Sequence, residues 1–413
     1  MRTFPDFFLA FALAAASSTA CSENNTSGTN NMATSGTDMS APVDLVPPVD
    51  LTPPPVPGSV QFIASGQELA VAGYAFPAAT DDPAFVDGWE VNFDEVLVTF
   101  DNISLSENPD KSAIDQSQTD AKVASVSGPW AVDLHKAGPL TSKEGGENHA
   151  VAIATINNQN LNGNTPFDPT KRYAFGYDVV PAVATAKSVN MDAQGKTDYQ
   201  LMVQKKWTVL YVGTATFKGV GCISTIPTYD FTKLPTVVKF KIGFTSPSMY
   251  VNCQNPENEP AAPLGTEDFQ RGIQINDGTT TVAELTMQTE RPFWQSFAGD
   301  SAFHFDQLAA LAKKDASNKF VVTEAELKGV NYTAFKDAAA APLPWRSCVA
   351  GYTPPPGLTS MGFDTVNIPY NPTGNPAQVI RDYLDYTTYL QSTQGKLNAD
   401  GHCFVKRGYP SPQ

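Results

Sequence analysis

Short runs of alternating apolar and polar residues recur between residues 60 and 290, and they constrain the fold more than any other feature. Examples are 89–93 (WEVNF), 130–134 (WAVDL) and 238–244 (VKFKIGF). Such alternation places apolar side chains on one face of a β-strand. Turn-forming clusters separate the runs, and no helical repeat lies between them. The sequence therefore predicts a mainly β fold, an antiparallel β-sandwich of immunoglobulin-like or jelly-roll topology.

Local signals refine this prediction. The alternation changes phase at Asp94-Glu95, which predicts a β-bulge. Asn276-Asp277-Gly278 lies between two β-rich runs and predicts a hairpin that joins them. The polar segments 158–164 and 192–198 lack the ligand spacing of a calcium loop, and we interpret them as turns.

After Arg291 the pattern becomes helical and irregular. One helix is expected over 301–314, where apolar residues recur at helical spacing. Thr323-Glu324-Ala325-Glu326 is a capping box that starts a second, short helix. Asn375-Pro376 opens a third, which ends near Gly395. We expect these segments to pack on the sandwich.

The first 21 residues resemble an export signal. Arg2 precedes an apolar run, 7–16, and small residues lead to Cys21. Ser18-Thr19-Ala20-Cys21 resembles the lipobox of bacterial lipoproteins, whose cysteine receives diacylglycerol. We interpret Cys21 as the lipid attachment site. The alternative is an ordinary secretory peptide cut at the same bond.

The patterns divide the chain into four parts. Residues 1–21 are the lipoprotein-type signal peptide, and 22–59 form a disordered Ser/Asn/Thr-rich and then Pro-rich tether. Residues 60–290 form the β-sandwich domain, and 291–413 a C-terminal helical and irregular subdomain. We therefore expect a protein of the cell envelope, attached to a membrane, most consistently the outer membrane, through its N-terminal lipid.

The charge and the cysteines restrict the partners and the compartment. A formal charge of −15 argues against nucleic acid as a partner. Cys222, Cys253, Cys348 and Cys403 form an even set, which in an exported protein indicates two disulfides. Proximity along the chain predicts Cys222–Cys253 and Cys348–Cys403. None of the four has another cysteine two to four residues away, so we expect no zinc or iron–sulfur site.

Catalytic motifs are absent from the sequence: it has no G-x-S-x-G, H-E-x-x-H, P-loop or G-x-G-x-x-G. The runs 285–312, 344–348 and 392–401 resemble an uncharacterised group of exported proteins from myxobacteria and their relatives, to which no function is assigned. That resemblance implies a transition-metal site built partly from histidines.

This chain departs from the pattern at three positions: Gln288, Arg291 and Lys396 replace histidines. Of the implied ligands Glu290, His304 and Asp306 remain. A fixed cation repels a metal ion, so we expect no metal and no cofactor here.

Three functional hypotheses follow. The first is a lipid-anchored binding or structural module at the cell envelope, with an unknown protein or glycan ligand and no catalytic chemistry. The alternative is a periplasmic metal-binding or metal-dependent protein with a degenerate site near Glu290 and His304. A third, a glycan hydrolase, requires two opposed carboxylates that the sequence does not place.

Overall fold

The computed structural model describes residues 57–79, 83–144, 147–158, 165–258, 263–295, 302–354, 360–363, 369–376 and 378–407. All of these described residues belong to one compact unit. Cys21 and most of the tether lie outside the described residues. No helix in the described ranges is long and apolar enough to cross a membrane.

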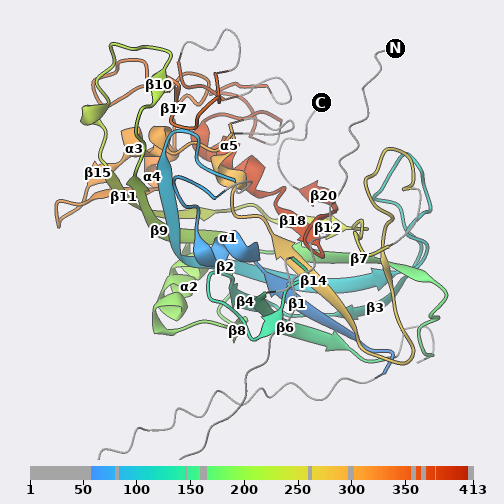
Figure 1. Ribbon diagram of the computed structural model, residues 1–413. Coiled ribbons are helices and arrows are strands. Elements are labelled where there is room, and N and C mark those ends of the chain that lie inside the picture. The colour runs from blue at the N-terminus through green and yellow to red at the C-terminus, as the bar shows by residue number, and fades with distance from the viewer. Residues whose placement is uncertain are drawn as a thin grey trace, which may run out of the picture. The chain divides into compact units, whose positions relative to one another are not determined.

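Two large sheets and one small ribbon build this unit (Figure 1). The six-stranded sheet has the order β19 (Gly401–His402), β18 (Gly395–Leu397), β14 (Thr281–Met287), β1 (Val60–Ser65), β6 (Asn148–Ile156) and β5 (Leu140–Thr141). The ribbon pairs β10 (Ile223–Ser224) with β17 (Arg346–Ser347).

The twelve-stranded sheet has a main path of eight strands: β15 (Lys313–Lys314), β16 (Phe320–Thr323), β11 (Val237–Phe244), β9 (Val209–Phe217), β2 (Trp89–Ser106), β7 (Arg172–Val179), β12 (Ser248–Val251) and β20 (Phe404–Arg407). Four strands flank this path: β3 (Lys122–Val126) and β4 (Trp130–Asp133) pair with β2, β8 (Lys187–Val189) with β4, and β13 (Ile273–Gln274) with β7.

The two large sheets pack face to face around one hydrophobic core. Phe62 of β1 stacks on Phe175 of β7, with ring centroids 5.8 Å apart. Both are fully buried, and the same cluster includes apolar side chains of β14, β9 and β11. The predicted mainly β fold is confirmed. The immunoglobulin-like or jelly-roll type stays a prediction.

The long strand β2 runs through the middle of the larger sheet. Its pairing with β9 shifts register between Phe93 and Glu95, so the predicted bulge is confirmed. The pairing is not antiparallel throughout, because β1–β14, β11–β16 and β4–β8 are parallel.

The predicted hairpin around Asn276-Asp277-Gly278 is wrong. β13, before it, pairs with β7, whereas β14, after it, pairs with β1 and β18. The turn therefore connects the two sheets. A turn motif fixes the local chain reversal only, and the hydrogen-bonding partners of its flanking strands depend on tertiary packing.

Residues 192–198, predicted to be a turn, form the N-cap and first part of α2 (Ala193–Lys205). The Asp192 side chain accepts the Gly195 N–H at 2.8 Å and caps this helix. Tyr199 and Met202 of α2 pack with Leu97 and Leu210 in a second, smaller apolar cluster. This cluster lies on the face of the twelve-stranded sheet that points away from the main core.

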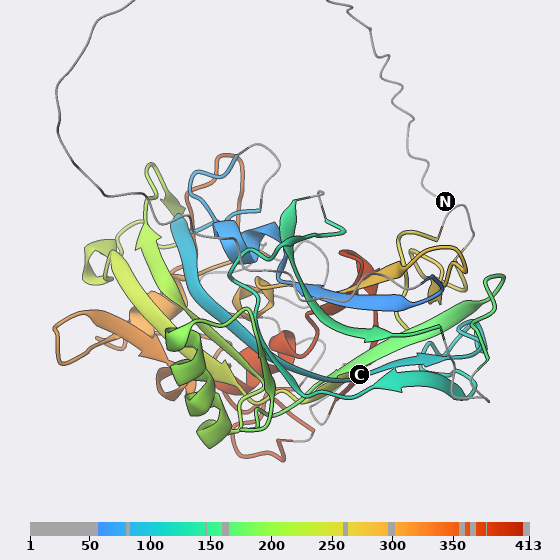
Figure 2. The same cartoon turned by 90° about the horizontal axis from the view of Figure 1, so that it is seen from below.

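Two of the three predicted helices, those expected over 301–314 and from Asn375, are shorter than predicted, and three further short helical segments were not predicted. The helical segments besides α2 are α1 (Gln67–Ala72), α3 (Asp306–Leu311), α4 (Glu324–Leu327), α5 (Tyr383–Gln391), and the 3-10 turns η1 (Phe231–Lys233) and η2 (Arg291–Phe293). The Thr323 capping box before α4 is confirmed in both of its hydrogen bonds. α5 begins after Asp382, well past the predicted start at Asn375. Figures 1 and 2 show α2 on the outer side of the sheet.

The two disulfides form, but the predicted pairing is wrong. Cys222 bonds to Cys348 and Cys253 to Cys403. The reason is strand pairing. β10 pairs with β17 beside the first bridge, and β12 pairs with β20 beside the second. Each bridge thus ties the C-terminal segment to an earlier strand, across 126 and 150 residues respectively.

Candidate functional site

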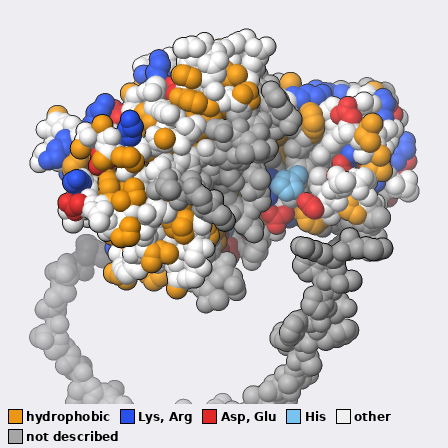
Figure 3. Space-filling view, turned by 90° about the horizontal axis from the view of Figure 1, so that it is seen from above, with side chains coloured by type: hydrophobic (Ala, Val, Ile, Leu, Met, Phe, Trp, Pro, Cys, Tyr) orange, Lys and Arg blue, Asp and Glu red, His pale blue; other side chains and the backbone are white. Residues whose placement is uncertain are grey.

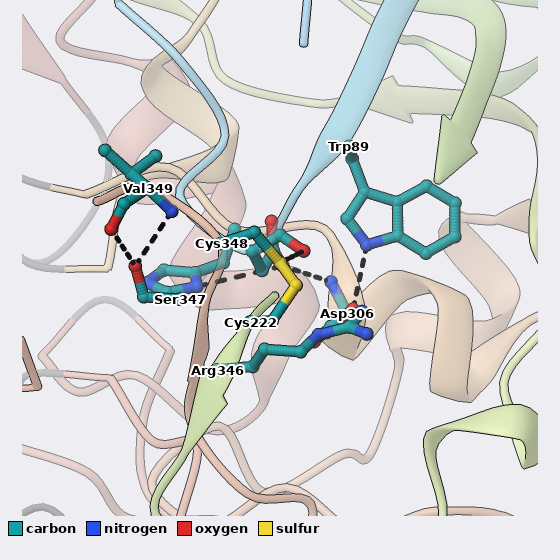
Figure 4. The surroundings of a disulfide bond; sticks show 9 residues. Trp89, Cys222, Asp306, Arg346, Ser347, Cys348 and Val349 are labelled. Atoms are coloured by element: carbon teal, nitrogen blue, oxygen red, sulfur yellow. Dashed lines mark hydrogen bonds and ion pairs between the residues drawn. A yellow bond between two sulfur atoms is a disulfide. The ribbon is translucent and has the colours of Figure 1, made fainter. Parts of the chain in front are cut away.

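Asp306, one of the predicted candidates, is the centre of a buried network next to the Cys222–Cys348 bridge (Figure 4). Its carboxylate accepts a hydrogen bond from Trp89 Nε1 at 2.8 Å and two from the guanidinium of Arg346, one of them at 2.8 Å. The Arg346 guanidinium carbon also lies 4.2 Å from the centroid of the Phe217 ring. A carboxylate with these three donors already has its partners, so Asp306 holds the ribbon against β2 and is not free for a ligand.

His304, the second candidate, is fully buried in the same region. Its Nε2 lies 3.1 Å from Gln295 Oε1, and its Nδ1 lies 3.8 Å from a carboxylate oxygen of Asp87. That oxygen of Asp87 also accepts the backbone N–H groups of Phe305 and Asp306, both at 2.7 Å, at the start of α3. His304 and Asp306 therefore have separate partners and do not chelate one ion.

Glu290, the third candidate, belongs to a different set of contacts. The Tyr74 hydroxyl donates to Glu290 Oε2 at 3.3 Å and lies 3.1 Å from the Thr289 hydroxyl. Burial raises the pKa of Glu290, and the positive charges of Arg291 and Lys396 oppose that shift. Among the described residues, no group of three His, Cys, Asp or Glu side chains is placed to bind a metal ion.

The structure instead gathers polar side chains on the outer face of the six-stranded sheet. Strand register places Thr286, Lys396 and His402 side by side on neighbouring strands, because directly paired residues share a face. The alternate residues Leu285 and Leu397 point into the core. We call this side of the sheet, which faces away from the main core, the polar face; it comprises Ser65, Glu284, Thr286, Gln288, Lys396 and His402. Ser65, Glu284, Thr286 and Lys396 are buried there.

Glu284 anchors the polar face. It is fully buried, and its carboxylate accepts hydrogen bonds from the Ser65 and Ser142 hydroxyls and from the backbone N–H of Lys143. Its own N–H donates to Asn398 Oδ1 at 2.9 Å. Three donors stabilise a buried carboxylate, so Glu284 fixes the loop after β5 against β1 and β14.

Glu144 follows in that loop and is partly buried. Gln67 Nε2 and the Glu68 N–H donate to its two oxygens, at 3.1 and 3.3 Å. Gln67 has a φ of 64°, a backbone conformation that residues other than glycine rarely adopt. Burial raises the pKa of Glu144 to about 6, and the negative charges of Asp400, Glu284 and Glu290 add to the shift.

Basic groups border these acids. Lys396 is 6% exposed, and its Nζ lies 3.3 Å from Asp400 Oδ1. Arg291, at the start of η2, donates to Gln288 Oε1 from Nε at 2.9 Å and also from Nη2. Burial lowers the pKa values of Arg291 and Lys396, and in Lys396 the charge of Arg291 adds to this effect. Partial burial of its ring lowers the pKa of His402, with the charges of Lys396 and Arg291 contributing.

Two tyrosines of the larger sheet position the backbone around Lys396 through hydrogen bonds. The Tyr177 hydroxyl donates to the Lys396 carbonyl at 3.1 Å, and the Tyr250 hydroxyl to the Ser392 carbonyl at 2.9 Å. A Cβ added at Gly395 would lie 2.5 Å from the Tyr177 hydroxyl, so only glycine permits this approach.

Figure 3 shows a histidine side chain with acidic and basic side chains beside it, in a notch of the upper face. Sequence reasoning placed Glu290, Arg291 and Lys396 in one region but missed Glu144 and Glu284. The alternation within β14 is the signal for Glu284, because Leu285 and Met287 point to the core and leave Glu284 on the opposite face. No comparable signal exists for Glu144, which lies in a loop.

Comparison with known proteins identifies no relative: no family model, no curated protein and no solved structure matches the chain.

Proposed function

We propose that this protein is an exported, lipid-anchored module of the cell envelope that acts by binding a ligand. The observation that carries the proposal is the pair of disulfides, each joining segments more than 100 residues apart in the chain. Such bridges form and persist in oxidising compartments outside the cytoplasm. The apolar run before Cys21 and the tether after it supply a route to that compartment and an attachment there.

Binding, as opposed to a structural role alone, is supported by the polar face. Together with Glu144 and Arg291 at its border, it gathers acidic and basic groups, several of them buried, at one place on the six-stranded sheet. Desolvating charged groups costs free energy, and clusters of perturbed titratable groups are enriched at functional sites. The predicted alternative, metal binding near Glu290 and His304, is disfavoured because Arg291 and Lys396 place positive charge beside Glu290.

Mass spectrometry of the mature N-terminus tests the attachment. We expect diacylglycerol on Cys21 and recovery of the protein with membranes, and Cys21→Ser is expected to release it. Ser22→Ala is the matched control and should remain membrane-bound. Recovery of the wild-type protein in the soluble fraction with an unmodified Cys21 thiol would overturn the proposal.

A further inference from the structure

Arg291 differs from every other arginine whose side chain the structure describes. Those four, Arg172, Arg271, Arg346 and Arg381, each have a carboxylate oxygen within 4.0 Å. Arg291 is 8% exposed, yet no described carboxylate lies within that distance. Among the described residues, the neutral amide of Gln288 is the one hydrogen-bond acceptor of this buried guanidinium, and the charge of Glu290 compensates it from nearby without a direct ion pair.

A buried donor without an acceptor among the described residues lies against Arg291. The guanidinium carbon is 3.8 Å from the centroid of the Trp294 ring, so the two groups stack. Trp294 Nε1 is buried and has no hydrogen-bond partner among the described residues. Native proteins satisfy almost all buried donors, so this one requires an explanation.

Lys396 adds a second positive charge. The N–H of Gln288, the residue that Arg291 contacts, donates to the Gln394 carbonyl at 3.1 Å, two residues before Lys396. The repulsion from Arg291 that helps to lower the pKa values of Lys396 and His402 agrees with this proximity. The ion-pair partner of Lys396 is Asp400, whose side chain is 68% exposed. An exposed partner neutralises little of a buried charge, because solvent screens the pair. Arg291 and Lys396 thus bring two positive charges to one region of a strongly acidic protein, with Glu290 as the nearest described acid that influences both.

We propose that Arg291 and Lys396 bind an oxyanion group of the ligand, a carboxylate or a phosphate. The fork of a guanidinium matches two oxygens of either group, and an ammonium adds a point charge beside it. This inference rests on the proposed binding function and names the ligand chemistry. The nearby carboxyl groups of Glu290, Glu144 and Asp400 restrict the site to a single small anionic group, because a larger anionic surface would meet their charge.

The test is calorimetric titration of the purified full-length protein with inorganic phosphate and, separately, with glutarate. Both are run at low ionic strength against a sodium chloride control, because salt screens such contacts. We expect saturable binding of at least one anion at one site, accompanied by a rise in the unfolding temperature. Binding of phosphate alone would identify a phosphorylated ligand, and binding of glutarate alone a carboxylate.

Arg291→Gln is expected to weaken binding about tenfold or more, since it removes a charge-assisted contact. Arg291→Lys should give an intermediate loss, because it keeps the charge and loses the fork. Arg381→Gln removes an arginine already paired with Asp385 and is the matched control, expected to bind as the wild type. Lys396→Met provides a second variant if Arg291→Gln does not fold.

Absence of saturable binding for both anions would overturn the inference, as would unchanged affinity in Arg291→Gln and Lys396→Met. A purely structural Arg291 would lower the unfolding temperature of its variant and leave the anion-dependent rise intact. These outcomes are independent of lipid on Cys21, so the failure of one proposal is distinguishable from the failure of the other.

Discussion

At the scale of single residues, the close approach of Gly395 to two tyrosine rings positions the polar face. A Cβ at this residue would lie 2.5 Å from the Tyr177 hydroxyl and 2.6 Å from a carbon of the Tyr250 ring. Both rings are fully buried in the core and have no room to move away. The absence of one methyl group therefore lets β18 carry Lys396 across the sheet next to Thr286.

Gly395→Ala is expected to lower the free energy of unfolding by about 1–3 kcal/mol, the usual cost of overpacking a core. Gly278→Ala is the matched control, because a Cβ there meets nothing within 4 Å. Urea denaturation of the two variants measures the difference. Equal stability of both variants would show that the two tyrosine rings can move to accommodate the added methyl group.

At the scale of elements, β2 and α2 meet through a buried group of charged residues at the bulge. Glu95 is 4% exposed and shares a hydrogen bond with Asp198 of α2. Lys241 of β11 donates to Asp198. Burial raises the pKa of Glu95 to about 8, with further contributions from Asp198 and Asp133, and Lys241 opposes the shift. The folded protein therefore keeps Glu95 protonated at neutral pH, so that it is a hydrogen-bond donor to Asp198.

This raised pKa predicts a stability that falls with rising pH. Glu95 releases its proton near pH 4.5 in the unfolded chain and near pH 8 in the folded chain. Between these two pH values the folded state therefore holds one more proton than the unfolded state. The contribution of Glu95 is complete below about pH 4.5 and is lost as pH rises through 8, at up to about 1.4 kcal/mol per unit.

Glu95→Gln has no proton to lose and should not follow this dependence. The measurement is the difference in unfolding free energy between wild type and Glu95→Gln at pH 5, 7 and 9. We expect the wild type to lose stability relative to the variant across this range. Glu90→Gln, on the same strand but only half-buried, is the control. A constant difference at all three values would contradict the assignment.

At the scale of the whole molecule, the disulfides join the C-terminal segment to earlier parts of the chain. Residues after 291 extend both large sheets, through β18 beside β14 and β20 beside β12. The Cys222–Cys348 bridge attaches this segment at the ribbon, and the Cys253–Cys403 bridge attaches it beside β20. The C-terminal segment consequently completes the fold and supplies part of the polar face.

Non-reducing peptide mapping is expected to recover Cys222 linked to Cys348 and Cys253 linked to Cys403. A peptide joining Cys222 to Cys253 would contradict the fold. The double variant Cys222→Ser/Cys348→Ser should lose about 4–5 kcal/mol of stability, because the bridge closes a long loop in the unfolded chain. The single variant Cys348→Ser, which also frees Cys222 for exchange, should in addition form mixed disulfides.

The elements that local physics specifies could be predicted from the sequence. Alternation at period two predicted β2 with its bulge and β11, because alternate side chains along much of each strand are buried. The capping box at Thr323 was predictable because its hydrogen bonds join residues three apart. α2 was missed because few of its side chains are buried, so its apolar stripe is faint and its acidic start resembles a turn.

Only the tertiary structure decided the pairings between distant segments. The sequence determined that four cysteines form two bridges, but their partners follow from which strands pair, and strand pairing is set by the common core. The same holds for the polar face. Arg291 and Lys396 are about 100 residues apart, and they are neighbours because β18 pairs with β14. Which strands pair depends on how the side chains of entire sheet faces pack together in the core. A short stretch of sequence does not carry that information.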